Sequence, residues 1–312
     1  MEDRDYRKVF ETLVTKTGEY IKNAGLKTMV LGISGGIDST VVAAICSEVE
    51  ARTGIPLIGR SLPTKFNKSE EVNTAVLVGE AFCEEGNFEE CSIKILHDTF
   101  ISFLKTEKYG MTPLANGNIQ ARLRMNYLFY LAGVSGGIVM DTDNMTENNL
   151  GYWTIFGDQG LLNPIGDLWK TEVFKFAEFL VEYYKQRSKL HSQTDLKLKD
   201  LSRSNAISES LKLKPTAGLG ITDSDLEELG ADSYEQVDTV LKEILSWREF
   251  VKNKYTNFED LKSAFWKTIE NAEMISPETP DTGVPWSIYK NITKRHFASE
   301  FKRQQLPVKI KL

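Results

Sequence analysis

The sequence is poor in cysteine and histidine, with three of each among 312 residues. Cys46, Cys83 and Cys91 have none of the spacings of a zinc site or a disulfide framework, which favours a reducing compartment and predicts a cytoplasmic protein. The histidines are scattered, so neither a histidine metal site nor a Ser-His-Asp or Cys-His arrangement is expected. Residues Met1–Arg7 are charged and lack the apolar stretch of a signal peptide.

Long apolar runs and basic clusters are missing as well. No stretch approaches the length of a membrane span, so no membrane partner is expected. Lys and Arg number 38 against 44 Asp and Glu, which gives a net charge of −6. Without a basic stripe that alternates with aromatic residues, the chain has no expected nucleic-acid partner. With 41% hydrophobic and 26% charged residues, its composition is that of an ordinary globular protein.

Apolar runs alternate with helix-like segments along the first part of the chain. The pattern predicts strands at 28–32, 56–62, 91–96 and 137–141, and helices at 6–25, 38–52, 69–83, 117–132 and 171–184. Such alternation predicts an α/β fold, a doubly wound parallel sheet with helices on both faces and extra C-terminal helices. We expect a single domain over 1–312, with an insertion at about 186–213 and a helical C-terminal part at about 222–312.

The most informative segment is the glycine-rich loop Gly32-Ile33-Ser34-Gly35-Gly36-Ile37-Asp38-Ser39, which follows the first expected strand and precedes a helix. Adjacent glycines allow backbone N–H groups to form a nest for an anion, and a helix N-terminus also favours negative charge. Asp38 would repel a phosphate unless a cation lies between them, which indicates Mg²⁺. The pattern is neither a Walker loop nor a dinucleotide fingerprint.

Three further segments contain candidate binding residues. Arg122 and Arg124 follow Gly117-Asn118 in a strongly helical stretch, and an arginine there can bind a carboxylate or phosphate. Met140–Gly151 places acidic and hydroxyl residues directly after an apolar strand. Glu147 is therefore a candidate partner of Asp38 in binding a metal, and the same segment can also be the start of an N-capped helix. Gly157–Lys170 ends with a lysine at a helix start, where a nearby phosphate would explain its charge.

Taken in order, these motifs resemble those of NAD synthetases, which belong to the N-type ATP pyrophosphatases. The shared order is the Ser-Gly-Gly-x-Asp-Ser loop, Gly-Asn-x-x-Ala-Arg-x-Arg-Met, Thr-Asp-x-x-x-Glu, Gly-Tyr-x-Thr, Gly-Asp-x-Gly, Asn-Pro-x-x-x-Leu-x-Lys and Pro-Thr-Ala. The resemblance covers about residues 10–185 well and 214–230 moderately. It implies a Rossmann-like fold of the adenine nucleotide alpha hydrolase type. We expect the ammonia-dependent type, because no glutaminase domain precedes residue 1.

The resemblance implies an AMP-forming carbon–nitrogen ligase with ATP and Mg²⁺, which joins ammonia to deamido-NAD through an acyl-adenylate. It assigns the ATP phosphates to Gly32–Ser39, Mg²⁺ to Asp38 and Glu147, and further ATP contacts to Thr142, Lys170 and Thr216. Asp38 and Lys170 are the candidate catalytic residues, and Arg122 and Lys302 the candidate substrate-binding residues. The family is dimeric, with its dinucleotide site at the subunit interface, so a homodimer is implied.

The sequence departs from the family pattern where the family binds its acceptor. Ile155 stands in place of a lysine, Leu162 in place of an aspartate before Asn-Pro, and Phe301 in place of the histidine of a C-terminal His-Lys-Arg. The ATP-binding motifs are intact. A second possibility is therefore the same adenylation of a different acceptor, such as nicotinate mononucleotide.

Overall fold

The computed structural model describes residues 4–104, 108, 110–215, 225–255, 257–276, 282–303 and 308–309. These residues form two compact units. The first falls within Met1–Met145, Trp153–Asp223 and Pro307–Leu312, and the second within Thr146–Tyr152 and Ser224–Leu306.

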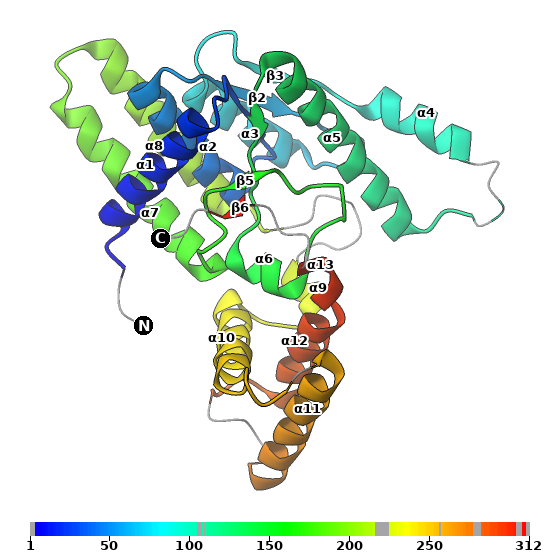
Figure 1. Ribbon diagram of the computed structural model, residues 1–312. Coiled ribbons are helices and arrows are strands. Elements are labelled where there is room, and N and C mark those ends of the chain that lie inside the picture. The colour runs from blue at the N-terminus through cyan, green and yellow to red at the C-terminus, as the bar shows by residue number, and fades with distance from the viewer. Residues whose placement is uncertain are drawn as a thin grey trace. The chain divides into compact units, whose positions relative to one another are not determined.

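The first unit is built around a parallel sheet of four strands in the order β3-β2-β1-β4 (Figure 1). The strands are β1 (Met29–Gly32), β2 (Leu57–Ser61), β3 (Phe88–Glu90) and β4 (Ile138–Val139). Met29 pairs with Leu57 on one side and Ile138 on the other. The chain adds β2 and β3 on one side of β1 and then returns to add β4 on the other. This reversal makes the carboxyl end of β1 and β4 a switch point, where open α/β sheets bind ligands.

Helices cover both faces of this sheet, as the sequence predicts. Those of the larger core are α1 (Tyr6–Asn23), α2 (Ile37–Thr53), α3 (Ser69–Phe82), α7 (Lys170–Leu190) and α8 (Thr194–Lys212), and those of the other face are α4 (Lys94–Leu104) and α5 (Pro113–Ser135). Met29 and Leu31 face the larger core, whereas Val30 faces the core beneath α5, as the alternation of a strand requires.

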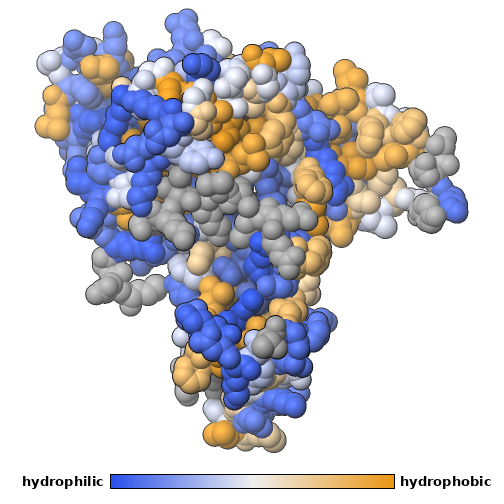
Figure 2. Space-filling view, in the orientation of Figure 1, coloured by the Kyte–Doolittle hydropathy of each residue, from blue (hydrophilic) through white to orange (hydrophobic). Residues whose placement is uncertain are grey.

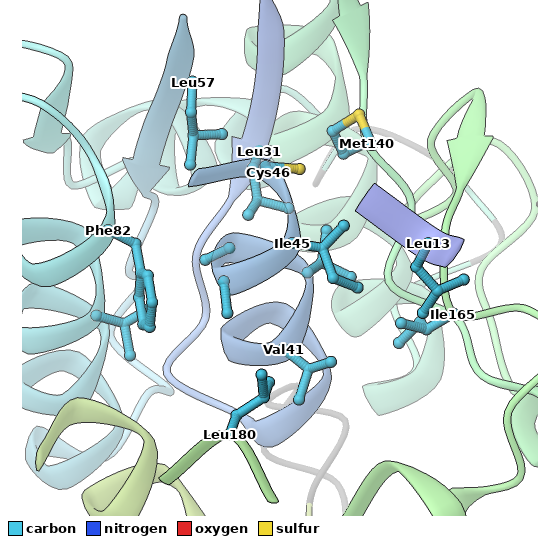
Figure 3. Packing of buried hydrophobic residues seen from close by; sticks show 14 of the residues in the cluster. Leu13, Leu31, Val41, Ile45, Cys46, Leu57, Phe82, Met140, Ile165 and Leu180 are labelled. Atoms are coloured by element: carbon cyan, nitrogen blue, oxygen red, sulfur yellow. The ribbon is translucent and has the colours of Figure 1, made fainter. Parts of the chain in front are cut away.

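Helix α2 is buried almost all round and lies at the centre of the larger core. Figure 3 shows Val41, Ile45 and Cys46 of α2 among Leu13, Leu31, Leu57, Phe82 and Leu180. Burial raises the pKa of the Cys46 and Cys83 thiols, in the case of Cys83 to about 12, so both behave as apolar core residues. Helix α8, within the segment expected as an insertion, contributes Ala206 and Ile207 to the same core.

One expected strand is wrong. The alternation in Cys91–Leu96 predicts a strand, but β3 ends at Glu90 and α4 begins at Lys94. Ile93 is buried while Ile95 is exposed, although a strand would place them on one face. The alternation instead reflects a core residue just before an amphipathic helix.

The second unit is helical. It contains most of α6 (Met145–Leu150) together with α9 (Asp225–Leu229), α10 (Tyr234–Phe250), α11 (Phe258–Ile275), α12 (Trp286–Ala298) and α13 (Glu300–Arg303). Trp247 packs edge-on against Phe265, with their ring centroids 4.8 Å apart. Phe250, at the end of α10, is exposed. A short parallel pair, β5 (Leu162–Asn163) and β6 (Val308–Lys309), belongs to the first unit.

Among the described residues, no helix is both long enough and apolar enough to cross a membrane.

Candidate functional site

The glycine-rich loop connects β1 to α2 at the carboxyl edge of the sheet, as its sequence predicts. Gly35 has a φ of 86°, in the region that favours glycine. A Cβ there would lie 2.4 Å from the carbonyl oxygen of Glu71 in α3, so the backbone also needs glycine for space. Ser34 and Ser39 close the loop, with their hydroxyl oxygens 3.0 Å apart. The side chains of Ile33 and Ile37 point into the core, and Ile33 N–H donates to Arg60 O at 2.9 Å, which fixes the start of the loop to β2.

A serine of α8 holds the loop from behind. The Ser210 hydroxyl donates to the carbonyl oxygen of Gly35 at 2.7 Å and accepts a hydrogen bond from Thr40 Oγ1 at 3.0 Å. Thr40 also donates to the carbonyl oxygen of Gly36. The two contacts of Ser210 are buried, and the one with Gly35 spans 175 residues, so sequence reasoning had no signal for it.

Asp38 lies in the first turn of α2 and is bound from two other parts of the first unit. Lys170 Nζ lies 2.5 Å from Asp38 Oδ2, and the Asn144 amide donates to Oδ1 at 2.9 Å. Lys170 begins α7 and is 2% exposed, whereas the Asp38 side chain is 17% exposed. The structure thus joins Asp38 and Lys170, which are 132 residues apart in sequence, and adds Asn144, which the sequence analysis missed.

Through Asn144, the loop after β4 meets the loop after β1 at the carboxyl edge of the sheet. Asn144 follows β4, and the residues just before it, Asp141 to Asp143, form a tight turn in which Asp143 N–H donates to Asp141 Oδ1. Thr142 lies half-buried in this turn. A polar residue right after a buried strand was the available signal for Asn144.

Helix α5 contains the Gly-Asn-x-x-Ala-Arg-x-Arg-Met motif, whose polar side chains contact two different segments of the chain from two faces of the helix. Asn118 and Arg122, four residues apart, both contact the segment after α6: Asn118 Oδ1 accepts from Thr154 Oγ1 at 2.7 Å, and Arg122 Nε donates to the carbonyl oxygen of Ile155 at 3.2 Å. Arg122 is exposed, which agrees with a role in binding.

Gln120 and Arg124 lie on another face of α5 and hold the loop after β2. Gln120 Oε1 accepts from Thr64, and Arg124 donates to the carbonyl oxygen of Leu62 and to Asn67 Oδ1. Burial lowers the pKa of Arg124 to about 10, against the opposing effect of two carboxylates, so it stays charged at neutral pH. Of the two arginines in the motif, Arg124 has a structural role and Arg122 is the one open to a ligand.

Glu147 and Lys302 belong to the second unit. Glu147 is half-buried in α6. Lys302 Nζ donates to the carbonyl oxygen of Gly151 at 2.8 Å, and Arg303 donates to that of Asn149. The C-terminal helix thus binds the carboxyl end of α6, where cations are favoured by the helix dipole. Thr216 lies outside the described residues.

A buried ionic cluster supports this contact within the second unit. His296 is bonded to Asn149 O through Nδ1 and to Arg248 through Nε2. Burial and the charges of Arg303 and Arg248 lower the pKa of His296 to about 3, so the ring is neutral. Burial alone would raise the pKa of Glu300, but its bonds to the same two arginines lower it to about 2.

The oxygen donors fit a metal that is shared with phosphates better than a metal cage made by protein alone. Among the described residues, no group of three or more His, Cys, Asp or Glu side chains could hold an ion. Asp38 is a single, partly exposed carboxylate at the end of the glycine-rich loop. Mg²⁺ commonly binds one or two carboxylates together with substrate phosphates, so Asp38 fits that mode.

The departures from the family pattern have different surroundings. Ile155 is half-buried beside Arg122, and Phe301 is exposed on α13. Leu162 is fully buried in the core, so its side chain cannot reach an acceptor, whereas its neighbour Leu161 is 51% exposed.

Comparison with known proteins shows which family this chain resembles in sequence. The family model described as NAD synthase matches residues 9–276. The chain is 32% identical over 238 residues to the NH(3)-dependent NAD(+) synthetase of Methanococcoides burtonii, covering 76% of this chain and 79% of that protein. It is 31% identical over 251 residues to the enzyme of that name from Fusobacterium nucleatum, covering 80% of this chain and 84% of that protein.

Solved structures show the same fold. The NMN synthetase from Francisella tularensis matches with a TM-score of 0.67 and 23% identity, over 98% of each chain. The NH3-dependent NAD synthetase from Campylobacter jejuni, solved with a nitrate ion, matches with a TM-score of 0.51 and 24% identity, over 68% of this chain and 99% of that one.

Proposed function

This chain belongs to the NAD synthase family, and we propose that it is an ammonia-dependent NAD synthetase. It converts deamido-NAD, ATP and ammonia to NAD, AMP and pyrophosphate. The observation that carries the proposal is the phosphate nest at the N-terminus of α2, with Asp38 and Lys170 joined beside it at the switch point of the sheet.

The reaction has two steps because a carboxylate is a poor electrophile. An oxygen of the nicotinate carboxylate attacks the α-phosphorus of ATP, and the bond from that phosphorus to pyrophosphate breaks. Ammonia then attacks the acyl carbon of the adenylate, the bond to AMP breaks, and a proton is lost from nitrogen. The first step needs negative charge to be stabilised on the pyrophosphate, and the second needs water to be excluded.

The residues of the loop suit the first step. Gly32–Ser39 would bind the pyrophosphate portion of ATP through backbone N–H groups held by Ser210 and Thr40. Lys170 is buried and charged, and it would exchange part of its contact with Asp38 for a phosphate oxygen. Thr142 and Thr216 are proposed as further ATP contacts. Positioning and charge account for catalysis, so no nucleophilic side chain is required.

We propose that Mg²⁺ accompanies ATP and is held by Asp38, with Glu147 as a second ligand. Bound Mg²⁺ would supply positive charge against the phosphate oxygens. The protein's own part is to fix the Asp38 carboxylate, which Asn144 and Lys170 do from two sides.

Arg122 is proposed to bind the acceptor, since its guanidinium is exposed at the edge of the sheet that holds the loop. Lys302 is proposed as a second acceptor contact. Ile155 favours a second candidate, nicotinate mononucleotide, because an apolar side chain stands where the family has a cation. The fold match to an NMN synthetase is compatible with this acceptor.

We also propose a homodimer formed through α4 and α5. Figure 2 shows apolar side chains gathered over these helices. The exposed apolar residues there are Ile95, Leu96, Phe100, Phe103, Leu114, Phe129, Tyr130 and Val134. An exposed patch of this kind marks an interaction surface. Because α5 also bears Arg122, a second copy bound to the patch would lie near Arg122. Val134→Glu should shift the sedimentation of the protein to the monomer, whereas Leu190→Glu, exposed at the end of α7, should not.

A product assay tests the reaction. The purified chain is incubated with ATP, Mg²⁺ and ammonium, and with deamido-NAD or nicotinate mononucleotide in separate tubes, and AMP, pyrophosphate and the amide are followed by mass spectrometry. AMP coupled to NAD supports the proposal; AMP only with the mononucleotide supports the second candidate. Asp38→Asn should abolish AMP formation. Asp195→Asn is the matched control, because Asp195 is exposed in the first turn of α8.

A further inference from the structure

Phe156 has an unusual backbone for an aromatic residue. Its φ is 57°, and it is the one non-glycine residue with positive φ among those that the structure describes. It lies at the third position of a turn closed by Gly157 N–H donating to Thr154 O at 2.8 Å, where glycine or asparagine is favoured. Its side chain is 80% exposed. The ring therefore contributes no burial that would offset the strained backbone.

The turn is held rigidly in place. Thr154 N–H donates to Asp158 Oδ1 at 2.8 Å, and the Thr154 hydroxyl donates to Asn118. Arg122 donates to Ile155 O, and a Cβ on Gly157 would lie 3.2 Å from the Cβ of Ala121 in α5, so the helix and the turn pack closely. Since strained residues persist where their surroundings fix them, the backbone of Phe156 is held and its Cα–Cβ bond has a defined direction.

This turn lies beside the proposed ATP site. A few residues further on, Leu161 N–H donates to Val139 O and Leu162 O accepts from Asp141 N–H, which fixes the segment to the carboxyl end of β4. That end also bears Asn144, which binds Asp38. The exposed ring and the exposed guanidinium of Arg122 are thus attached to one turn at the edge where ATP and its acceptor must meet.

We propose that Phe156 is a substrate-binding residue that stacks on a flat heteroaromatic ring of the acceptor, next to Arg122. This inference rests on the proposed function and deepens it. Every heteroaromatic ring has a π-face, so stacking can replace part of the charge recognition that is missing at Ile155. The strained backbone is then maintained because it directs the ring toward the acceptor.

Phe156→Gly separates the two effects of the residue. Glycine accepts the positive φ, so the variant should be at least as stable as the wild type in urea unfolding. Without the ring, KM for the acceptor should rise about five- to hundredfold, the range for loss of one stacked base. KM for ATP should be unchanged. Phe156→Asn, which also accepts positive φ, should behave alike, and Phe156→Tyr should keep the wild-type KM.

Both acceptors are assayed with each variant, and wild-type turnover is measured first. If the wild type forms no amide with deamido-NAD and none with nicotinate mononucleotide, the proposed function itself is refuted. Given wild-type turnover, a raised KM for both acceptors would assign the stacked ring to the pyridine, and a raised KM for deamido-NAD alone would assign it to the adenine. An acceptor KM that Phe156→Gly leaves unchanged would overturn the inference. Phe250→Ala, which removes an aromatic ring 88% exposed on α10, is the control.

Discussion

Ser210→Ala tests whether α8 fixes the shape of the glycine-rich loop, Gly32–Ser39. The Ser210 hydroxyl is the donor to Gly35 O, and alanine would leave that buried carbonyl without this bond. Thr40 loses an acceptor but still donates to Gly36 O, so only one buried group loses its partner. Loss of one such bond lowers the free energy of unfolding by about 1 to 2 kcal/mol.

The same change should weaken ATP binding. If the loop keeps its shape through Gly35 O, part of that free energy reappears as a KM for ATP raised by up to about tenfold, since about 1.4 kcal/mol corresponds to a factor of ten. KM for the acceptor should be unaffected. Ser208→Ala is the matched control on the same helix, because the Ser208 hydroxyl donates only to Ser204 O within α8 among the contacts described.

Urea unfolding and initial-rate kinetics with varied ATP measure both quantities. If the Ser210→Ala protein has the same unfolding free energy and the same KM for ATP as the Ser208→Ala control, then Ser210 does not fix the shape of the loop. A loss of stability without a change in ATP KM would show that α8 supports the core but not the shape of the loop.

Other changes at the loop and in the second unit have equally definite outcomes. Lys170→Met should lower the free energy of unfolding by about 3 kcal/mol, because it leaves a partly buried carboxylate unpaired; combined with Asp38→Asn the loss should be much smaller than the sum, and additivity in a double-mutant cycle would contradict the pairing. Gly35→Ala should destabilise the protein by at least about 2 kcal/mol in thermal unfolding, since its φ is 86° and its Cβ would meet a backbone oxygen of α3. Acid should destabilise the second unit. Glu300 has its pKa lowered from 4.5 to about 2, so its contribution is complete above pH 4.5 and is lost as the pH falls toward 2. His296 has its pKa lowered from 6.5 to about 3, so the folded state disfavours its protonation and stability falls over that window too; His296→Gln should flatten the pH dependence of the urea midpoint there.

Local patterns in the sequence determined most of the sheet and the position of the glycine-rich loop. The preference of a short apolar run for a strand, and of the segment after it for a helix, depends on residues that are close in sequence. Accordingly β1, β2, β4 and the helices α2, α3 and α5 lie close to their predicted positions. The alternation in Cys91–Leu96 misled because two isoleucines two positions apart match the period of a strand, although Ile93 is a core residue before α4 and Ile95 is an exposed residue on it. Parallel strands also fix which loops share an edge, so the meeting of the Asp38 and Asn144 loops follows from the pattern of strands.

Tertiary structure alone decided which side chains complete the site. The contacts of Ser210 with Gly35 and of Lys170 with Asp38 join residues more than a hundred positions apart, and no local preference encodes such a contact. The local pattern of the motif on α5 did not distinguish its two arginines, and only the resemblance to NAD synthetases assigned Arg122 to the substrate. The packing of the helix places Arg124 against the loop after β2 and leaves Arg122 exposed at the turn that contains Ile155 and Phe156, because the two side chains lie on different faces of one helix.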